Sequence, residues 1–233
     1  MVGTESGPPE LRAVCFDYFD TLVAHRRPTV PHAEQLGLVD EYTTVWRDWG
    51  RRRQTSRTSY RALLLAVYER AGQEPDLALV DTLCEDRRTR QKDVLMNPDA
   101  RILDLLEQCR SAALPIAVVS NAAEEDVAAW GHSPFAPLVD APVFSFEVGT
   151  VKPDQRILEE ALRRLGLPAI SCAFVSDSVS DLVAADAAGF AAGYRAAWFV
   201  DKGSDSGRPV PWTDVHDPTT LAHLIARNGG ASL

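Results

Sequence analysis

The sequence predicts an α/β fold in which a Rossmann-like parallel sheet core carries an inserted α-helical segment. Over residues 97–233, short apolar runs typical of buried strands alternate with stretches of helical periodicity. This is the pattern of parallel strands joined by right-handed crossover helices. About 75 residues without a clear strand separate the first apolar run from the second, which indicates a long helical insertion. Several apolar runs also end in polar residues, as strands beside a binding crevice do.

The first strand is predicted over Leu11–Phe16, where the chain is almost wholly apolar. The insertion that follows contains two segments of helical periodicity, Arg61–Ala71 and Asp76–Asp93. We therefore expect a core of residues 1–22 and 97–233 and a helical insert of residues 23–96.

The remaining elements alternate between helix and strand. They are predicted as helix Asp99–Ala113, strand Ile116–Val119, helix Glu124–Trp130, strand Val143–Phe146, helix Asp154–Leu165, strand Cys172–Val175, helix Ser180–Ala188 and strand Ala196–Val200. The segment 201–217, rich in Gly, Ser, Asp and Pro, predicts a loop, and Pro218–Arg227 predicts a final helix.

Polar side chains follow four of the predicted strands. Asp17 ends the first, Ser120 and Asn121 end the second, Lys152 comes a short step after the third, and Asp177 ends the fourth. Because the carboxyl ends of parallel strands meet at one edge of the sheet, these side chains are expected to face one crevice.

Length and composition narrow the class of protein. A chain of 233 residues with 45% apolar content can bury a full core. No apolar stretch approaches the roughly 20 residues that span a bilayer, and the N-terminus lacks the basic and apolar parts of a signal peptide. We therefore expect a cytoplasmic protein that does not act at a membrane.

The net charge and its distribution along the chain limit the kinds of partner that are expected. The formal net charge of -9 disfavours nucleic acid, because like charges repel. The insert is mildly basic, with 13 Lys and Arg against 11 Asp and Glu, whereas the rest of the chain has 11 against 22. A small anionic molecule is the expected partner, and the oligomeric state stays open, a homodimer being compatible with the sequence. The four cysteines form no CxxC pair and are expected to be free core thiols.

The ordered set of Asp17, Ser120, Lys152 and the pair Asp177 and Asp181 closely resembles the four motifs of the haloacid dehalogenase-like superfamily. The resemblance covers most of the chain. It implies a hydrolase whose insert is a helical cap that closes over the active site and determines the substrate.

The resemblance also implies a role for each motif residue. Asp17 would be the nucleophile that forms a covalent intermediate, and Thr21 would orient its loop. Ser120 would donate a hydrogen bond to the group transferred, Asn121 would shape the turn, and Lys152 would neutralise charge. The residues alone leave other roles open: Asp17 could cap a turn, Ser120 could cap the next helix, and Lys152 could be solvated.

A metal site is the second implication. Asp177 and Asp181 lie four residues apart and could join Asp17 in holding Mg²⁺, with the backbone carbonyl of Phe19 as a further ligand by resemblance. The structural alternative is that Asp177 caps the following helix while Asp181 is favoured by the helix dipole.

Phe19 departs from the pattern of the superfamily's phosphatases, which usually have a second Asp at that position. A phenyl ring cannot transfer a proton, and the neighbouring Asp20 points in another direction. The first expectation is nevertheless a Mg²⁺-dependent phosphatase of a small metabolite, acting through an aspartyl-phosphate. The second is a metal-free 2-haloacid dehalogenase, a class with an aromatic residue at this position. The third is a catalytically weak regulatory or binding member.

The insert offers one indication about the substrate. Arg53, Arg57 and Arg61 recur at intervals of four, as do Arg47 and Arg51, so one helix face could present a row of guanidinium groups to an anion. A solvated face is the alternative. Arg26, just after the first motif, is predicted to contact substrate.

Overall fold

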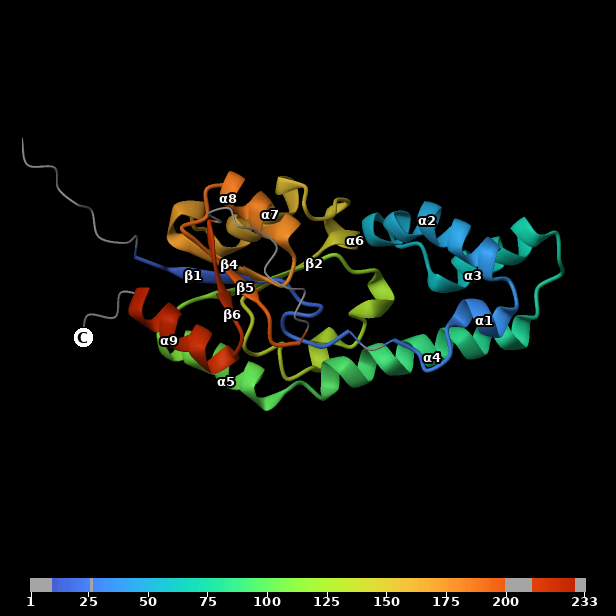
Figure 1. The fold of residues 1–233 in the computed structure, drawn as a ribbon, viewed down its shortest axis with the longest axis horizontal. Helices are drawn as coiled ribbons and strands as arrows, with labels where there is room; N and C mark the ends of the chain where they lie inside the picture. Colours follow the sequence, from blue (N-terminus) through green and yellow to red (C-terminus); the bar gives the residue numbers. More distant parts are fainter. Residues whose placement is uncertain (1–9, 26, 200–210, 229–233) are drawn as a thin grey trace, which may run out of the picture.

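The computed structural model describes residues 10–25, 27–199 and 211–228, and Figure 1 shows an elongated molecule with the sheet at one end and the insert at the other. The described residues form a six-stranded parallel sheet in the order β3-β2-β1-β4-β5-β6, which confirms the predicted α/β fold. The strands are β1 Ala13–Phe16, β2 Ile116–Ser120, β3 Ala141–Phe144, β4 Cys172–Ser176, β5 Ala192–Ala196 and β6 Trp212–Val215.

Helices cover both faces of the sheet because its central strands are apolar on both sides. In β1, Val14 and Phe16 pack with α5 and α9 on one face, whereas Ala13 and Cys15 pack with α7 and α8 on the other (Figure 1). Two-sided burial is why these strands are continuous apolar runs in the sequence. The helices of this part are α5 Ala100–Ser111, α6 Ser145–Val148, α7 Gln155–Leu165, α8 Val179–Ala187 and α9 Pro218–Asn228.

Between β1 and β2 the chain forms a helical insert with an apolar core of its own. Leu63 and Leu64 of α3 pack there with Val45 of α2 and Leu83 of α4. The third helix ends at Gly72, whose φ of 65° is a conformation that glycine adopts at little cost. The helices of the insert are α1 His32–Leu36, α2 Val39–Thr55, α3 Tyr60–Ala71 and α4 Leu77–Met96.

The four cysteines are free thiols, as predicted. Cys15, Cys109 and Cys172 are buried free thiols and Cys84 is a half-buried one. Burial raises the pKa of Cys109 to about 12, so this thiol stays protonated.

Within the described ranges, no helix has both the length and the apolarity that a bilayer crossing requires.

The helix predicted over Glu124–Trp130 is wrong. The chain there forms two short 3-10 turns, Glu124–Asp126 and Trp130–His132. Asp126 turns back and accepts a hydrogen bond from the backbone N–H of Ala123 at 3.0 Å, which fixes a tight turn in place of a helix.

The strand predicted over Val143–Phe146 ends two residues early, at Phe144, and α6 begins at Ser145. The Oγ of Ser145 accepts a hydrogen bond from the backbone N–H of Ala122 at 3.0 Å and donates to the same residue's carbonyl at 3.2 Å. These two hydrogen bonds with Ala122 turn the chain away from the sheet at Ser145, although the apolar pattern of the sequence continues to Phe146.

The last two strands of the sheet, β5 and β6, also differ from prediction. Residues 192–196 form β5, earlier than the predicted strand Ala196–Val200, whose last residue lies outside the described part. Part of the predicted loop 201–217 is β6, while residues 201–210 lie outside the described part. Both strands are only partly buried, and Arg195 of β5 pairs with Asp214 of β6 at 2.6 Å, so neither strand is an apolar run.

The predicted row of arginines does not lie on one helix. The second helix ends at Thr55, because the chain is extended at Ser56 (φ -157°, ψ 170°). Arg57 therefore lies in a loop and Arg61 begins a different helix, where it pairs with the exposed Asp81 at 3.1 Å.

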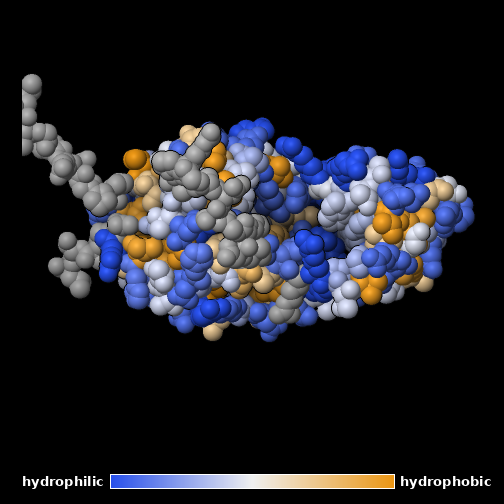
Figure 2. Space-filling model, viewed as in Figure 1, coloured by the Kyte–Doolittle hydropathy of each residue, from blue (hydrophilic) through white to orange (hydrophobic). Residues whose placement is uncertain are grey.

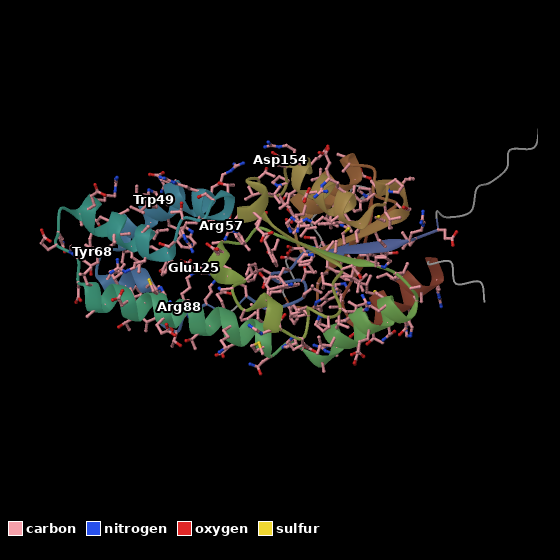
Figure 3. All side chains as sticks on the ribbon, turned by 180° about the vertical axis from the view of Figure 1, so that it is seen from behind. Trp49, Arg57, Tyr68, Arg88, Glu125 and Asp154 are labelled. Carbon is pink, nitrogen blue, oxygen red and sulfur yellow. The ribbon has the colours of Figure 1, made fainter. Side chains whose placement is uncertain are left out.

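The insert is attached to the sheet-bearing part through ion pairs. Three consecutive acids after β2, Glu124, Glu125 and Asp126, pair respectively with Arg57, Arg53 and Arg87 of the insert. Arg53 and Glu125 are separated by 2.5 Å, and the Arg53 side chain is only 2% exposed, whereas that of Arg57 is 63% exposed. Figure 3 shows Arg57 and Glu125 where the insert meets the sheet-bearing part.

Replacing Glu125 by Gln is expected to destabilise the fold far more than the same change at Glu124. Glu125→Gln leaves the buried Arg53 charge without its counter-ion, a loss that typically costs about 3–5 kcal/mol. Glu124→Gln breaks an exposed pair, worth about 0–1 kcal/mol. The free energies of unfolding come from urea titrations of both variants and the unsubstituted chain. Equal destabilisation by the two changes would contradict the importance of the buried pair.

Candidate active site

Three central strands end at one point, where they bring the predicted motif residues together. Asp17 directly follows β1, Ser120 is the last residue of β2, and Asp177 directly follows β4. The parallel register places Phe16 beside both Val118 and Val175, so the three strand ends are adjacent. The sheet order reverses direction around β1, the place where open α/β sheets bind ligands.

Asp17 is a buried carboxylate whose two oxygens have different partners. Its Oδ1 pairs with the ammonium of Lys152, and its Oδ2 accepts a hydrogen bond from the hydroxyl of Thr21 at 3.3 Å. Lys152 is also buried and lies 2.9 Å from Oδ2 of Asp181. One ammonium group therefore pairs with two carboxylates and holds Asp17 in a fixed orientation.

Thr21 joins the loops that follow β1 and β4. Besides donating to Asp17, its Oγ1 accepts a hydrogen bond from the backbone N–H of Asp177 at 3.0 Å. The indole N–H of Trp198 donates to the Thr21 carbonyl at 2.8 Å. The threonine hydroxyl thus connects the Asp17 carboxylate with the loop that follows β4.

Asn121 holds the backbone of Lys152. Its side-chain oxygen accepts from the Lys152 N–H at 2.7 Å, and its amide nitrogen donates to the Lys152 carbonyl at 3.0 Å. The neighbouring Ser120 is buried, and its Oγ has no hydrogen-bond partner among the residues that the structure describes. Ser120 therefore has a hydroxyl available at the strand end for a ligand, and Asn121 determines where Lys152 can reach.

Ser176, the last residue of β4, was not singled out from the sequence. Its hydroxyl lies 3.5 Å from Asp181 Oδ2 and accepts from the backbone N–H of Ser178 at 3.1 Å. Its position at a strand end is the same signal that identified Ser120, and applying that rule to every strand would have found it.

Phe19 and Asp20 occupy the positions where an acid for the leaving group was sought. The Phe19 ring packs edge-on against Tyr18 and the ring of His25, with centroids 4.7 Å and 5.4 Å away. Asp20 has a φ of 59°, and its carboxylate accepts a hydrogen bond from the backbone N–H of His25 at 2.9 Å. Asp20 therefore stabilises its own turn. Arg26, predicted to contact substrate, lies outside the described residues.

The charged side chains of the site shift one another's pKa values. Burial raises the pKa of Asp17 from its usual value of 3.8 to about 6, with the charge of Lys152 opposing the rise and Asp181 and Asp177 adding to it. Burial acts against the charge of Lys152, but the two carboxylates outweigh it and raise the pKa of Lys152. At neutral pH the site holds an ionised Asp17 carboxylate beside the Lys152 cation.

The arrangement around Lys152 bears on the predicted metal site. A magnesium ion held by Asp17, Asp177 and Asp181 would need their oxygens to converge on one point. Here Lys152 lies between Asp17 and Asp181 instead. Within the described ranges, no three Asp, Glu, His or Cys side chains are grouped as metal ligands. The donor set, as arranged, does not fit a magnesium ion.

A cavity of about 940 Å³ opens where the insert meets the sheet-bearing part. Phe19 and Asn121, near neighbours in the chain of Asp17 and Ser120, border it, so the cavity adjoins the strand ends that hold those two residues. Figure 2 shows hydrophilic residues gathered along this junction. The arrangement provides an ionised carboxylate that could act as a nucleophile, a cation beside it, an available hydroxyl and a large adjoining space.

Comparison with known proteins agrees with this geometry. A family model described as haloacid dehalogenase-like hydrolase matches residues 11–189. A curated relative, the (S)-2-haloacid dehalogenase 4A of Burkholderia cepacia, is 30% identical over 193 residues, which cover 77% of this chain and 80% of the relative.

Solved structures share the fold. A 2-haloacid dehalogenase from Pseudomonas syringae pv. Tomato has a TM-score of 0.66 and 22% identity, covering 93% of this chain and 99% of that one. A HAD-family hydrolase from Bacillus subtilis, YfnB, whose structure contains magnesium, has a TM-score of 0.61 and 15% identity, with the same coverage.

Activity that depends on Asp17 as nucleophile is expected to fall at acid pH. Because the raised pKa of Asp17 is about 6, kcat/KM should be half-maximal near pH 6 and fall about tenfold per unit below it. Lys152→Met removes the charge that lowers this pKa, so the acid limb should move to higher pH. Rate profiles between pH 4 and 9 measure both. An acid limb unmoved by Lys152→Met would contradict the assignment to Asp17.

Proposed function

The chain belongs to the haloacid dehalogenase-like hydrolases, and from that premise we propose that it hydrolyses the carbon–halogen bond of a 2-haloacid through an ester on Asp17. The observation that carries the proposal is the environment of the leaving group. Phe19 stands where a proton donor would be needed, and the Asp20 carboxylate is bonded within its own turn. A halide leaves as a stable anion and needs no proton, so it suits this site. The name of the Burkholderia cepacia relative supports the same choice.

In the first step, an oxygen of the ionised Asp17 attacks carbon 2 of the haloacid. The new carbon–oxygen bond forms as the carbon–halogen bond breaks, and the halide leaves with the bonding electron pair. Lys152 and Thr21 hold the carboxylate in line for this attack. Since Lys152 also neutralises Asp17, the approach of an anionic substrate meets less repulsion than at an isolated carboxylate.

In the second step, water hydrolyses the ester. Water adds to the carboxyl carbon of Asp17, and the carbon–oxygen bond within that carboxyl group breaks. The products are a 2-hydroxyacid, a regenerated carboxylate and a proton. The Ser120 hydroxyl and the Lys152 ammonium are the donors at this strand edge that can stabilise the oxyanion formed during the addition.

The substrate's own carboxylate needs a cationic environment, and the cavity beside Asp17 supplies it. Arginines from α2 and α4 border the cavity, although the chain as a whole is acidic. The proposed partner is therefore a small organic anion that enters from the side of the insert.

Phosphoryl hydrolysis is the second candidate function, and one observation favours it. Asp177 provides an acidic side chain at the end of β4, close enough to contribute to the raised pKa of Asp17. A magnesium-dependent reaction would require Lys152 to move from its position between Asp17 and Asp181. The two candidates differ in product and in metal dependence, so one set of assays separates them.

The expected activity is release of chloride from 2-chloropropionate at an unchanged rate in EDTA. Asp17→Asn should lower kcat by at least about 10³-fold, because the nucleophile is lost. Asp20→Asn is the matched control: it keeps an oxygen that can accept from the His25 N–H, and it should retain most of the activity. Chloride release and circular dichroism measure activity and folding.

Hydrolysis in ¹⁸O-labelled water tests the intermediate directly. A single turnover should place the label in the Asp17 carboxyl group, detectable by peptide mass spectrometry, and later turnovers should carry it into the hydroxyacid. Label found only in the product of a single turnover would rule out the ester. Phosphate release that requires Mg²⁺, without halide release, would establish the second candidate.

A further inference from the structure

The cavity that adjoins the active site is large for a simple haloacid. Its volume of about 940 Å³ lies at the upper end of the roughly 300–1,000 Å³ typical of sites for drug-sized ligands. A three-carbon acid bound at Asp17 would fill only the end near Phe19 and Asn121.

One face of α2 runs along the cavity. Tyr42, Trp46, Gly50 and Gln54 recur at intervals of four residues and all border it. At 1.5 Å per residue the row spans about 18 Å. Gln54 marks the catalytic end, because its Nε2 donates to the backbone carbonyl of Asn121 at 3.1 Å.

Gly50 leaves space in the middle of this row. Glycine is the least favourable helix residue after proline, so its presence inside α2 suggests a need for room. A Cβ at this position would lie 3.7 Å from Nε1 of Trp46, an ordinary contact that alanine can make. A longer side chain would extend into the cavity that Gly50 borders.

The indole ring of Trp46 lies beside that space. Trp46 is 39% exposed and stacks on Tyr42, with ring centroids 5.8 Å apart, and the guanidinium carbons of Arg53 and Arg87 each lie 5.9 Å from its ring centroid. Tyr60 contacts Trp46 edge-on, at 6.5 Å between centroids, and is held by a hydrogen bond of 2.6 Å to Nδ1 of His32, whose Nε2 lies 2.6 Å from the carboxylate of Asp86. These contacts fix the rings, so the cavity presents a preformed aromatic wall.

The cavity is cationic although the chain carries a net charge of -9. Six arginines border it against one acid, Asp126. Three of the six, Arg53, Arg87 and Arg90, form ion pairs. Arg47 and Arg51, one helical turn apart on α2, form no ion pair with any residue that the structure describes. Along the helix axis they lie about 10 Å and 5 Å from Gln54.

The geometry points to a substrate with two anionic ends and a flat body between them. The reacting end lies at Asp17, an aromatic or similarly planar body lies in the space left at Gly50 beside Trp46, and a second carboxylate binds Arg47 and Arg51. This inference rests on the proposed function for the reacting end alone. It specifies the substrate as an aryl-substituted dianionic 2-haloacid.

Binding without reaction tests the cavity separately from the chemistry. The probe is 3-(4-carboxyphenyl)propionate, which has both carboxylates and the ring but no halogen, with propionate for comparison. Calorimetric titration should give a Kd at least tenfold lower for the dicarboxylate. Arg51→Gln should weaken its binding about 10- to 100-fold, the usual effect of losing a charge-assisted hydrogen bond.

Three further variants separate charge from shape. Arg52→Gln removes the same charge from the same helix at an exposed position that does not border the cavity, where Arg52 lies over Trp49, and should leave Kd unchanged. Gly50→Leu should weaken dicarboxylate binding at least tenfold, whereas Gly50→Ala should not. The ratio of kcat/KM for 2-bromo-3-(4-carboxyphenyl)propionate over 2-bromopropionate should exceed ten and fall in Arg51→Gln.

The outcomes distinguish this inference from the proposed function. Halide release from both bromoacids without preference, with no binding of the dicarboxylate probe, overturns the inference and leaves the role of Asp17 standing. Dicarboxylate binding that Arg51→Gln weakens, without halide release from either bromoacid, supports the cavity assignment and contradicts the proposed reaction. Equal binding in Gly50→Leu and Gly50→Ala overturns the placement of the body.

Discussion

The ion pair between Lys152 and Asp17 is the interaction on which the rest of the active site depends. Burial favours a protonated carboxyl group, and a protonated Asp17 could not act as a nucleophile. The buried ammonium opposes this effect and also contacts Asp181, while the side-chain amide of Asn121 holds the backbone of Lys152. The charge of Asp17 is therefore set by residues from several separate segments that meet only at the edge of the sheet.

The segment after β2 connects this chemistry to the insert. Its first residue, Asn121, holds the backbone of Lys152. The acids that follow, Glu124 to Asp126, pair with arginines of the insert. A single short stretch of backbone thus fixes both the reacting groups and the wall of the adjoining cavity. Movement of the insert would be transmitted to the site through these ion pairs.

The distribution of charge follows from the same arrangement. The sheet-bearing part carries most of the acidic residues, yet the space where a ligand must bind is surrounded by arginines. Arg53 and Arg87 form the ion pairs that attach the insert. Each guanidinium group also lies over the ring of Tyr60, at 5.1 Å and 5.0 Å from its centroid respectively. Arg47 and Arg51 stay available for a ligand. A local positive field inside an acidic molecule favours the entry of small organic anions.

The sequence by itself determined the parallel sheet and the motif residues at its edge. Apolar runs and the polar residues that end them are local patterns, and parallel strands bring their ends together without further information. Only the tertiary structure decided that Asn121 holds Lys152, that Asp126 breaks a predicted helix, and that Arg53 belongs to Glu125. The contacts of Asn121 with Lys152, of Arg53 with Glu125 and of Asp126 with Arg87 join residues from segments whose separation the local pattern does not encode. Helical or strand periodicity can be recognised from a few consecutive residues. The partners of a side chain depend on which distant segments the folded chain brings beside it.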